Sequence, residues 1–351
     1  MKAHHLSSYQ WAVIGAGPAG IAAVGKLLDQ GIPAQQILWC DPYFKVGDFG
    51  QLWSTVSSNT KAKLFTQFLE ACSSFSYAEV AEQFTLSQLD PEQTCALSYM
   101  AEPLQWITDQ LVQQVQVQYG MIHRIRLFEG RWHLYGETGI FCAQGVVLAT
   151  GSVAANLNYA GADVIPFDLA IDKTRLSKVA SPEATYAVFG SSHSAFIILR
   201  HLVEMKVKKI INFYRSPCRY AVDMGDWVLF DNTGLKGQTA QWAKRFIDGV
   251  LPDNLLRYQA TNYNIERYLA ECNKIIYAVG FNPRNTVVVD DYHPLQHNPH
   301  TGILAPGLFG LGIAYPERKV DLMGNVESQV GLWKFMTYLE KVIPLWLKYL
   351  P

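Results

Sequence analysis

The sequence has no Cys-x-x-Cys pair, although it contains six cysteines. A protein dithiol that cycles between a reduced and a disulfide form usually needs that spacing, so the simplest redox-active cysteine pair is excluded. In a chain of 351 residues we expect scattered cysteines to be buried thiols in a reducing compartment. The six are Cys40, Cys72, Cys95, Cys142, Cys218 and Cys272.

Long apolar runs and clusters of one charge are also missing. No apolar span reaches about 18 residues, and residues 1–10 lack the apolar centre of a signal peptide, so we expect neither a membrane span nor secretion. Lys and Arg number 29 against 30 Asp and Glu, without a basic run, which argues against nucleic acid as a partner. These absences predict a cytoplasmic protein that acts on a small molecule.

One stretch near the start carries the strongest motif. An apolar run over 11–14 predicts a buried strand, and Gly15, Gly17 and Gly20 follow it at G-x-G-x-x-G spacing before a helical period begins. The first glycine permits a tight turn, the second lets the backbone approach a pyrophosphate, and the third lets the helix pack on the strand. We therefore predict a dinucleotide at this turn, with Pro18 and Ala19 beside it; the alternative is an ordinary glycine turn before a helix.

A carboxylate supports the dinucleotide interpretation. The next apolar run, over 36–40, ends in Asp41, about 20 residues past the glycines, where a carboxylate can hold a ribose hydroxyl.

A second unit of the same kind begins at Thr185. A strand over 186–189 precedes a Gly-Ser-Ser turn and a helix over 196–205, with Ser and Ala in the places of the second and third glycines. The following strand, over 209–214, ends in an arginine, which suits a 2′-phosphate and favours NADPH over NADH; the alternative is a surface arginine. The residues predicted to hold this nucleotide are Gly190, Ser191, Ser192, His193, Ser194 and Arg215.

Further elements connect these units. We predict a helix over 103–115 with Pro103 in its first turn, a meander of strands over 117–119, 121–128 and 132–135, and two buried strands that end in glycine turns at Gly151 and Gly280. The final helix, over 329–350, is strongly apolar and is expected to serve core packing or a dimer seam. His293, His297 and His300 share one loop, but no carboxylate or thiolate spacing accompanies them, so no metal site is expected.

Taken in order, the two glycine units, the strands ending in Ala149-Thr150-Gly151 and Ala278-Val-Gly280, and the late turn over 308–312 resemble the two-dinucleotide-binding-domain flavoproteins. That superfamily includes the pyridine nucleotide-disulfide oxidoreductases and the flavin-containing monooxygenases. The resemblance implies an α/β fold of two Rossmann-like domains with parallel sheets, each with a small antiparallel meander. It implies FAD on a domain of residues 1–152 and 284–351, and NADPH or NADH on an inserted domain, 153–283.

The segment after Asp41 is similar to that of the flavin-containing monooxygenases. Its Gly50-Gln-Leu-Trp53 and Asn59-Thr60-Lys61 stretches match the family's Gly-Gly-Leu-Trp and Asn-Thr-x-Lys segments. The resemblance implies that Leu52, Trp53 and Thr60 contact FAD. It also implies that Asn59, the predicted catalytic residue, reaches the flavin edge and helps to hold its oxygenated form. The alternative is that Asn59 and Thr60 cap a helix over 61–69.

Two departures from the monooxygenase pattern are present. Ile165 stands where the signature F-x-G-x-x-x-H has its histidine, and Gly312 is followed by Ile313 instead of the aspartate that binds the ribityl chain. The N-terminus of the last helix, near Val330, is expected to face the flavin's pyrimidine edge and to stabilise negative charge there. Ile122, Ala149, Thr150, Gly151, Gly280, Gly312 and Val330 complete the predicted cofactor contacts.

The resemblance implies an FAD-dependent oxidoreductase that accepts hydride from NAD(P)H, with NADPH favoured, and passes electrons to oxygen and a small-molecule substrate. Two alternatives stay open. One is a flavin reductase of the disulfide-reductase type without a protein dithiol. The other is a non-catalytic flavin-binding redox sensor, in which Ser192 makes the second turn too degenerate for a nucleotide. A homodimer is also open.

Overall fold

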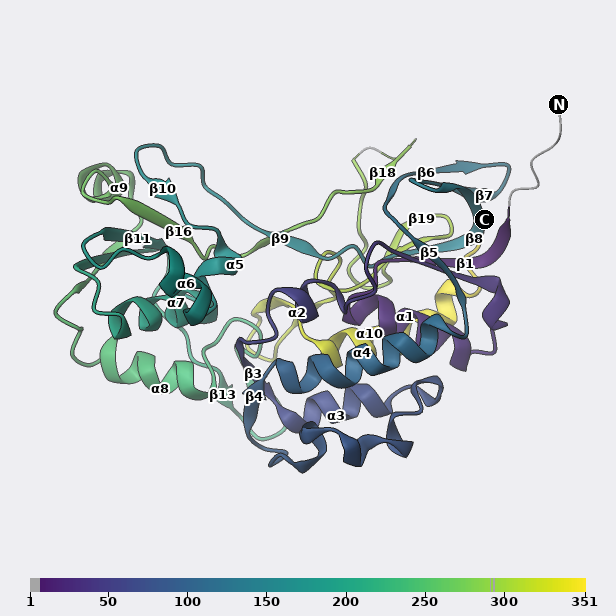
Figure 1. The fold of residues 1–351 in the computed structure, drawn as a ribbon, viewed down its shortest axis with the longest axis horizontal. Coiled ribbons are helices and arrows are strands. Elements are labelled where there is room, and N and C mark those ends of the chain that lie inside the picture. Colours follow the sequence, from purple (N-terminus) through teal and green to yellow (C-terminus); the bar gives the residue numbers. More distant parts are fainter. Residues whose placement is uncertain (1–6, 291, 293) are drawn as a thin grey trace. The chain divides into compact units, whose positions relative to one another are not determined.

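A computed structural model describes residues 7–290, 292 and 294–351 of the chain (Figure 1). The chain divides into two compact units: one contains residues up to Ser152 together with Pro283–Lys319 and Ser328–Pro351, and the other contains Val153–Asn282 and Val320–Glu327. The sequence-based boundaries placed 320–327 in the first domain. In the structure this segment groups with the second unit, where the buried carboxylate of Glu327 accepts hydrogen bonds from Asn232 and Thr233.

A mostly parallel sheet forms the centre of the first unit. Its strands are β1 (Ser8–Ile14), β2 (Ile37–Asp41), β5 (Gln116–Tyr119), β6 (Ile122–Phe128), β7 (Arg131–Gly136), β8 (Gly139–Leu148), β18 (Val288–Val289), β19 (Ile303–Ala305) and β20 (Leu308–Gly310). They run in the order β18–β6–β7–β8–β1–β2–β5, with β20 and β19 joined to β8. β5, β2, β1, β8 and β20 pair in parallel, whereas β6, β7 and the first part of β8 form an antiparallel meander.

Alternate residues of one strand serve the two faces of this sheet. Trp11 and Val13 of β1 lie in the core under the helices, whereas Ala12 and Ile14 lie in a second core that the meander covers. Successive side chains of a strand point to opposite faces, and a parallel strand is covered on both. For this reason the run at 11–14 is apolar throughout rather than alternating.

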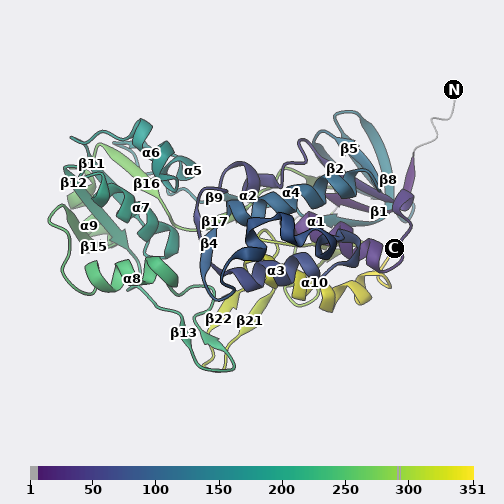
Figure 2. The same cartoon turned by 60° about the horizontal axis from the view of Figure 1, so that its bottom comes forward.

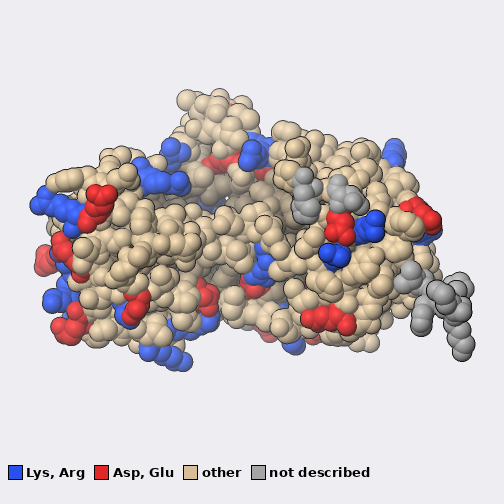
Figure 3. Space-filling model, turned by 90° about the horizontal axis from the view of Figure 1, so that it is seen from above, with Lys and Arg blue, Asp and Glu red and all other residues tan. Residues whose placement is uncertain are grey.

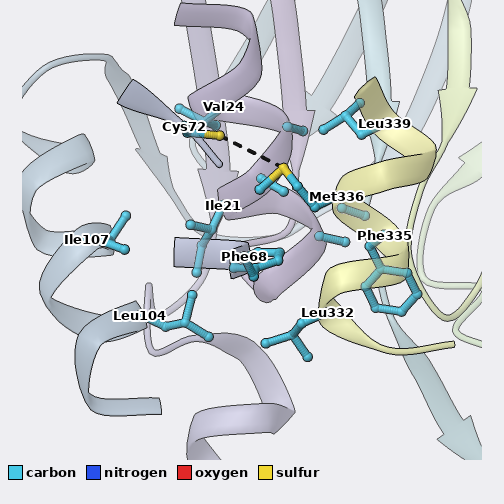
Figure 4. Close-up of a cluster of buried hydrophobic side chains, with 14 of the residues drawn as sticks. Ile21, Val24, Phe68, Cys72, Leu104, Ile107, Leu332, Phe335, Met336 and Leu339 are labelled. Carbon is cyan, nitrogen blue, oxygen red and sulfur yellow. Dashed lines mark hydrogen bonds between the residues drawn. The ribbon is translucent and has the colours of Figure 1, made fainter. Parts of the chain in front are cut away.

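Four helices cover the other face of the sheet (Figure 1). They are α1 (Pro18–Asp29), α3 (Ala62–Glu70), α4 (Ser98–Val112) and α10 (Leu332–Trp346). In Figure 4 the side chains of Ile21, Phe68, Leu104 and Met336 point toward one another from these four helices, and the thiol of Cys72 donates to the sulfur of Met336 over 4.0 Å. The apolar stripe of the last helix is therefore part of the core of the first unit.

The helices predicted over 103–115 and 329–350 are both present, but each begins at a different residue from the one predicted. α4 begins at Ser98, so Pro103 lies inside the helix and the prediction of a first-turn proline is wrong. Met100 is fully buried in line with Leu104, and this extra buried turn compensates for the hydrogen bond that Pro103 cannot make. α10 starts only at Leu332, because Gly331 before it has φ +141°, outside the helical region.

The meander also differs from its prediction. β5 is not part of it: β5 pairs in parallel with β2, at the opposite end of the strand order from β6. Gly120, with φ +116°, lets the chain leave β5 in a direction that most residues disfavour. The antiparallel meander therefore consists of β6, β7 and β8.

The second unit has a sheet of its own in which the pairings are parallel. It contains, in spatial order, β10 (Asp163–Val164), β16 (Lys274–Tyr277), β11 (Thr185–Phe189), β12 (Lys209–Tyr214) and β15 (Leu255–Gln259). Its helices are α5 (Phe167–Ala170), α6 (Lys173–Val179), α7 (His193–Glu204), α8 (Gly237–Phe246) and α9 (Asn262–Leu269). Ile265 of α9 packs on Ile211 and Ile275, whereas the ring of Phe196 in α7 lies 6.5 Å from Trp242 in α8.

Short elements complete the two units. The two-stranded pieces are β3 (Ser57–Lys61) with β4 (Thr94–Ala96), β9 (Ser152–Ala154) with β17 (Phe281–Pro283), β13 (Val222–Asp223) with β14 (Val228–Leu229), and β21 (Arg318–Val320) with β22 (Val326–Ser328) (Figure 2). α2 spans Gly47–Gln51, and 3-10 helices span Ala34–Gln36, Ser73–Phe75, Tyr77–Glu79, Ala81–Gln83 and Thr85–Gln88. In the second unit, the β13–β14 pair is an antiparallel piece of two short strands.

The charged side chains on the face shown in Figure 3 are of both signs and interspersed. This distribution agrees with the near-neutral composition of the chain. Within the part of the chain that the structure describes, no helix combines the length and apolar character needed to cross a bilayer.

Removal of a central core ring tests the packing of the first unit. Phe68 is fully buried, so Phe68→Ala should lower the free energy of unfolding by about 3–5 kcal/mol. The substitution removes the transfer free energy of the ring, and the cavity left behind removes the dispersion contacts of its neighbours. Val250→Ala, at a side chain that is 82% exposed, is the control and should change it by less than about 0.5 kcal/mol. Denaturant unfolding of the apoprotein measures both, and equal effects of the two substitutions would contradict the assigned core.

Candidate functional site

The first glycine turn is built by backbone packed directly on backbone. Gly15 has φ +110°, and its N–H donates to the carbonyl oxygen of Cys40 at 2.8 Å. A Cβ added to Gly15 would lie 2.3 Å from the carbonyl oxygen of Ala149, and one added to Gly20 would lie 1.9 Å from that of Gly15. Neither position can carry a side chain without displacing backbone, so glycine is required at both for steric reasons.

Gly17 is different, because it faces open space. A Cβ added there would meet no atom of the described residues within 4 Å. Gly17 is the N-cap of α1 in an extended conformation, without a side chain to cap the helix, and Pro18 is the first helical residue. The first-turn N–H groups of a helix have no intrahelical acceptor and carry partial positive charge, so this open side suits a pyrophosphate.

Asp41 is tied to the same turn. One carboxylate oxygen accepts the N–H of Ala16 at 2.8 Å, and the other accepts the N–H groups of Tyr43 and Phe44, both at 2.8 Å. A carboxylate has about four acceptor positions, so one remains for a hydroxyl of a ribose. Asp41 therefore orders the turn and still has an acceptor position for the ribose hydroxyl that the sequence motif implies.

The segment after Asp41 approaches the glycine turn from the other side. Gly47 has φ +56°, and a Cβ added there would lie 3.1 Å from Cα of Gly17. From α2 onward, the carbonyl oxygen of Asp48 accepts the N–H groups of Leu52 at 2.8 Å and Trp53 at 3.2 Å. The half-buried Leu52 and Trp53 are thus fixed to the element that contacts Gly17.

Asn59 and Thr60 lie in strand β3, which pairs with β4. The hydroxyl of Thr60 donates to Oδ1 of Asn59 at 3.4 Å, and its N–H donates to the hydroxyl of Ser58 at 2.8 Å. The alternative role as a helix cap is wrong, because α3 begins at Ala62 and its N-cap is Lys61, which makes no side-chain capping bond. Both side chains are half-buried and are available for a role other than capping.

The turn after β8 contains a buried hydroxyl, that of Ser152. The N–H of Ala149 donates to the carbonyl oxygen of Ile14 at 2.9 Å, and Gly151 has φ +72°. Ser152 is 3% exposed, and among the described residues its Oγ has no hydrogen-bond partner. A buried hydroxyl without a partner costs free energy unless a water or ligand engages it. Together with the open side of Gly17, it indicates that the first unit fits a polar ligand such as FAD.

The remaining predicted FAD contacts lie in different parts of the first unit, and not all of them are at the glycine turn. Gly312 has φ +86° and faces Ala19, with 2.7 Å between an added Cβ and the methyl group of Ala19. Val330 is 37% exposed and precedes α10, rather than lying within it. Ile122 is 2% exposed and belongs to the core under the meander. Gly312 thus lies at the glycine turn, whereas Ile122 is a core side chain.

The second glycine turn repeats the first. Gly190 has φ +129°, its N–H donates to the carbonyl oxygen of Phe213 at 2.9 Å, and an added Cβ would lie 2.2 Å from the carbonyl oxygen of Ala278. The N–H of Ala278 donates to Phe189, as that of Ala149 does to Ile14. Each unit therefore builds its turn at the ends of three strands in the same arrangement: β1, β2 and β8 in the first, and β11, β12 and β16 in the second.

The predicted side chains of the second turn lie at its helix. Ser192 is the N-cap of α7 without a capping hydrogen bond, and His193 and Ser194 are its first two residues. Ser191 donates from its hydroxyl to the carbonyl oxygen of Ser216 at 2.8 Å. Arg215 follows β12 and is exposed, and Gly280, with φ +100°, faces open space within the described part of the chain. An uncapped helix start next to an exposed arginine fits a phosphorylated nucleotide.

The sequence patterns missed two residues behind the second turn. Asn212 is fully buried, and its Nδ2 donates to the carbonyl oxygens of Val188 at 2.9 Å and Gly190 at 2.8 Å. Nε of Arg257 in turn donates to Oδ1 of Asn212 at 2.9 Å. The sequence signal that could have found Asn212 is its position as a polar residue inside the otherwise apolar strand over 209–214.

The histidine loop does not gather metal ligands. His293 lies outside the described residues, and among those described no group of three or more His, Cys, Asp or Glu is arranged to hold a metal. Burial, and secondarily the nearby charge of Arg318, lowers the pKa of His297 to about 4. The ring of His297 instead packs edge-on against Tyr315, 5.5 Å away.

Comparison with known proteins identifies the family. No family model matches the sequence. The monooxygenase AgnR1 of Paecilomyces divaricatus is 32% identical, over 95% of this chain and 97% of that protein. The chain belongs to the family of this monooxygenase.

Solved structures show the same fold in the wider superfamily. A flavin-containing monooxygenase from Stenotrophomonas maltophilia has a TM-score of 0.66 at 15% identity, covering 98% of this chain and 99% of that one. The bacillithiol disulfide reductase Bdr from Staphylococcus aureus has a TM-score of 0.63 at 10% identity, covering 98% and 99%. The predicted fold class and superfamily are thus confirmed.

Membership of this family makes the chain an oxidoreductase of the monooxygenase-like type. An ornithine N-hydroxylase of Kutzneria sp. 744, solved with reduced FAD and NADP+, has a TM-score of 0.64 at 13% identity, covering 97% of this chain and 99% of that one. These are the cofactors that the sequence predicts. The alternative of a non-catalytic sensor is disfavoured, because the relative that covers nearly the whole chain is an enzyme.

Alanine substitutions in the first turn separate a steric role from a ligand-binding one. Gly20→Ala should prevent stable folding of the first unit, because its Cβ collides with backbone at Gly15. Gly17→Ala should leave the melting temperature of the apoprotein within a few degrees but weaken FAD binding about tenfold or more, because its methyl group fills the open side of the turn. Thermal unfolding and FAD titration measure the two effects; tight FAD binding by Gly17→Ala would contradict the assigned side.

Proposed function

We propose that this protein takes hydride from NADPH onto FAD and uses the reduced flavin to transfer oxygen to a small nucleophilic molecule. The observation that carries the proposal is the repetition of one glycine-turn geometry, at Gly15 and Gly190, in a chain of a monooxygenase family. Two dinucleotide turns in one polypeptide match the need to hold a flavin and a nicotinamide at the same time.

The protein's share of this chemistry is binding and orientation. When bound, FAD accepts hydride from the nicotinamide and supplies electrons for the activation of oxygen. The Gly17 side of the first turn and Asp41 hold the pyrophosphate and ribose, and Leu52 and Trp53 position the flavin ring. The N-terminus of α10, after Gly331, presents partial positive charge that stabilises a reduced flavin.

Asn59 is the proposed residue for oxygen transfer. Its amide donates hydrogen bonds without adding charge, which suits the stabilisation of a polar group at the flavin edge. The position of Asn59 in β3, where it does not cap a helix, supports this role.

A dithiol relay receives no support from the cysteines, so the alternative that stays open is a reductase without a protein dithiol. Six free cysteines are present in the described part of the chain, and four of them are buried. Burial, the largest effect, raises the pKa of Cys272 to about 12 and also raises the pKa of Cys40 and Cys72. A thiol with a raised pKa is a poor nucleophile for disulfide exchange.

Anaerobic reduction followed by oxygen tests the proposed function. The purified protein should contain FAD, and NADPH without oxygen should bleach the flavin absorbance. When air and a panel of small amines and thioethers are added, NADPH consumption should be coupled to an oxygenated product from at least one compound. Return of the oxidised flavin with hydrogen peroxide as the only product, across the panel, would instead support an oxidase or reductase.

Asn59→Ala should uncouple the reaction. We expect the rate of flavin reduction by NADPH to change less than twofold, while the yield of hydrogen peroxide per NADPH rises several-fold, because the amide donor at the flavin edge is lost. Thr94→Ala, on the partner strand β4, is the control for the packing of the same two-stranded sheet. A peroxide yield equal to that of the wild type would remove the role assigned to Asn59.

Arg215→Ala tests the preference for NADPH. The substitution should raise KM for NADPH about tenfold or more and leave KM for NADH nearly unchanged, because only NADPH carries the 2′-phosphate. Arg267→Ala removes an exposed arginine of α9 in the same unit and serves as the control. Equal effects on the two coenzymes would dismiss the 2′-phosphate contact.

A further inference from the structure

One residue of the first unit, Arg284, is bonded to both sides of the turn that follows β8. It directly follows β17, where the chain returns from the second unit. Its N–H donates to the carbonyl oxygen of Gly151 at 3.0 Å, and its own carbonyl oxygen accepts the hydroxyl of Thr150 at 3.3 Å. Its Nη2 donates to the carbonyl oxygen of Ser152 at 3.2 Å. Arg284 thus contacts three consecutive residues of the turn.

The same guanidinium reaches a second cofactor segment. Nη2 of Arg284 pairs with Oδ2 of Asp48 at 2.5 Å. Asp48 lies in the first turn of α2, and its carbonyl oxygen accepts the N–H groups of Leu52 and Trp53. Hydrogen bonds through Arg284 and Asp48 therefore link the turn after β8 to the backbone of the two residues proposed to contact the flavin.

These contacts close a ring with the glycine turn. Gly47, next to Asp48, approaches Gly17, with 3.1 Å between its added Cβ and Cα of Gly17. At the other end, the carbonyl oxygen of Ala149 lies 2.3 Å from the position that a Cβ added to Gly15 would occupy. The glycine turn, α2 and the turn after β8 are linked in this way, and the open side of Gly17 and the buried hydroxyl of Ser152 belong to the linked segments.

We propose that the Arg284–Asp48 pair is a positioning device of the flavin site, which holds the α2 segment and the Thr150–Ser152 turn at the separation that bound FAD requires. The inference rests on the proposed function, since it assigns FAD to the first unit.

The exposure of the pair favours a positioning role over a stabilising one. The side chains of Arg284 and Asp48 are 32% and 23% exposed. Partly exposed ion pairs contribute little to stability. Their loss should therefore change the melting temperature little, whereas the geometry of the segments they hold should change more.

The test compares FAD affinity with apoprotein stability. Asp48→Asn and Arg284→Gln should each raise Kd for FAD about tenfold and shift the visible absorption band of the bound flavin, while the apoprotein melts within a few degrees of the wild type. The double variant should bind FAD no more weakly than the worse single variant, because both substitutions remove the same pair. Arg284→Lys keeps the charge and should recover part of the affinity.

The control is the pair between Arg175 and Asp168 in the second unit. It has a similar separation, 3.0 Å, and similar exposure, 35% and 34%. Arg175→Gln should leave FAD affinity and the flavin spectrum unchanged.

The outcomes separate the two hypotheses. Wild-type apoprotein that takes up no FAD would overturn the proposed function. Wild-type protein that binds FAD, with Asp48→Asn and Arg284→Gln within twofold of it in Kd and unchanged in spectrum, would overturn the positioning role alone. Additive effects in the double variant would overturn it too.

Discussion

The close approach of backbone to backbone at the two glycine turns is the constraint on which the structure depends. At Gly15 and Gly190, the carbonyl oxygen of an alanine at the end of a neighbouring strand occupies the space of a side chain. This contact brings three strand ends and the start of one helix to a single point in each unit. Because parallel strands all present their carboxyl ends at one edge of the sheet, that point is also where a ligand of the sheet binds.

The rest of the first unit supports this point from two sides. α1, α3, α4 and α10 share one core, so the helix that begins just after Gly17 is held by packing along its length. On the ligand side, Asp41, Asp48 and Arg284 make the polar contacts that order the loops. Apolar packing thus determines where the turn lies, and a small number of hydrogen bonds determines the arrangement of the loops around it.

The second unit reaches a similar arrangement with different side chains. The middle glycine is replaced by Ser192, and Asn212 and Arg257 form a hydrogen-bonded pair behind the turn. An alanine fits at the third position of this glycine motif. The methyl group of Ala195 would lie 3.2 Å from a Cβ added to Gly190. The backbone geometry is common to both turns, whereas the polar contacts are specific to each, which accords with two different dinucleotides.

By itself, the sequence determined the local features: the strand–turn–helix order at Gly15 and Gly190, the acid and the arginine after the second strands, and the apolar stripe of the last helix. Those features are set by residue type over short stretches, where steric demands and periodicity act directly. Only the tertiary structure decided that β5 pairs with β2, that Met100 carries α4 past Pro103, and that Glu327 joins the second unit. Arg284 and Asp48 are 236 positions apart, and a contact over that distance depends on how the whole unit packs rather than on any local pattern.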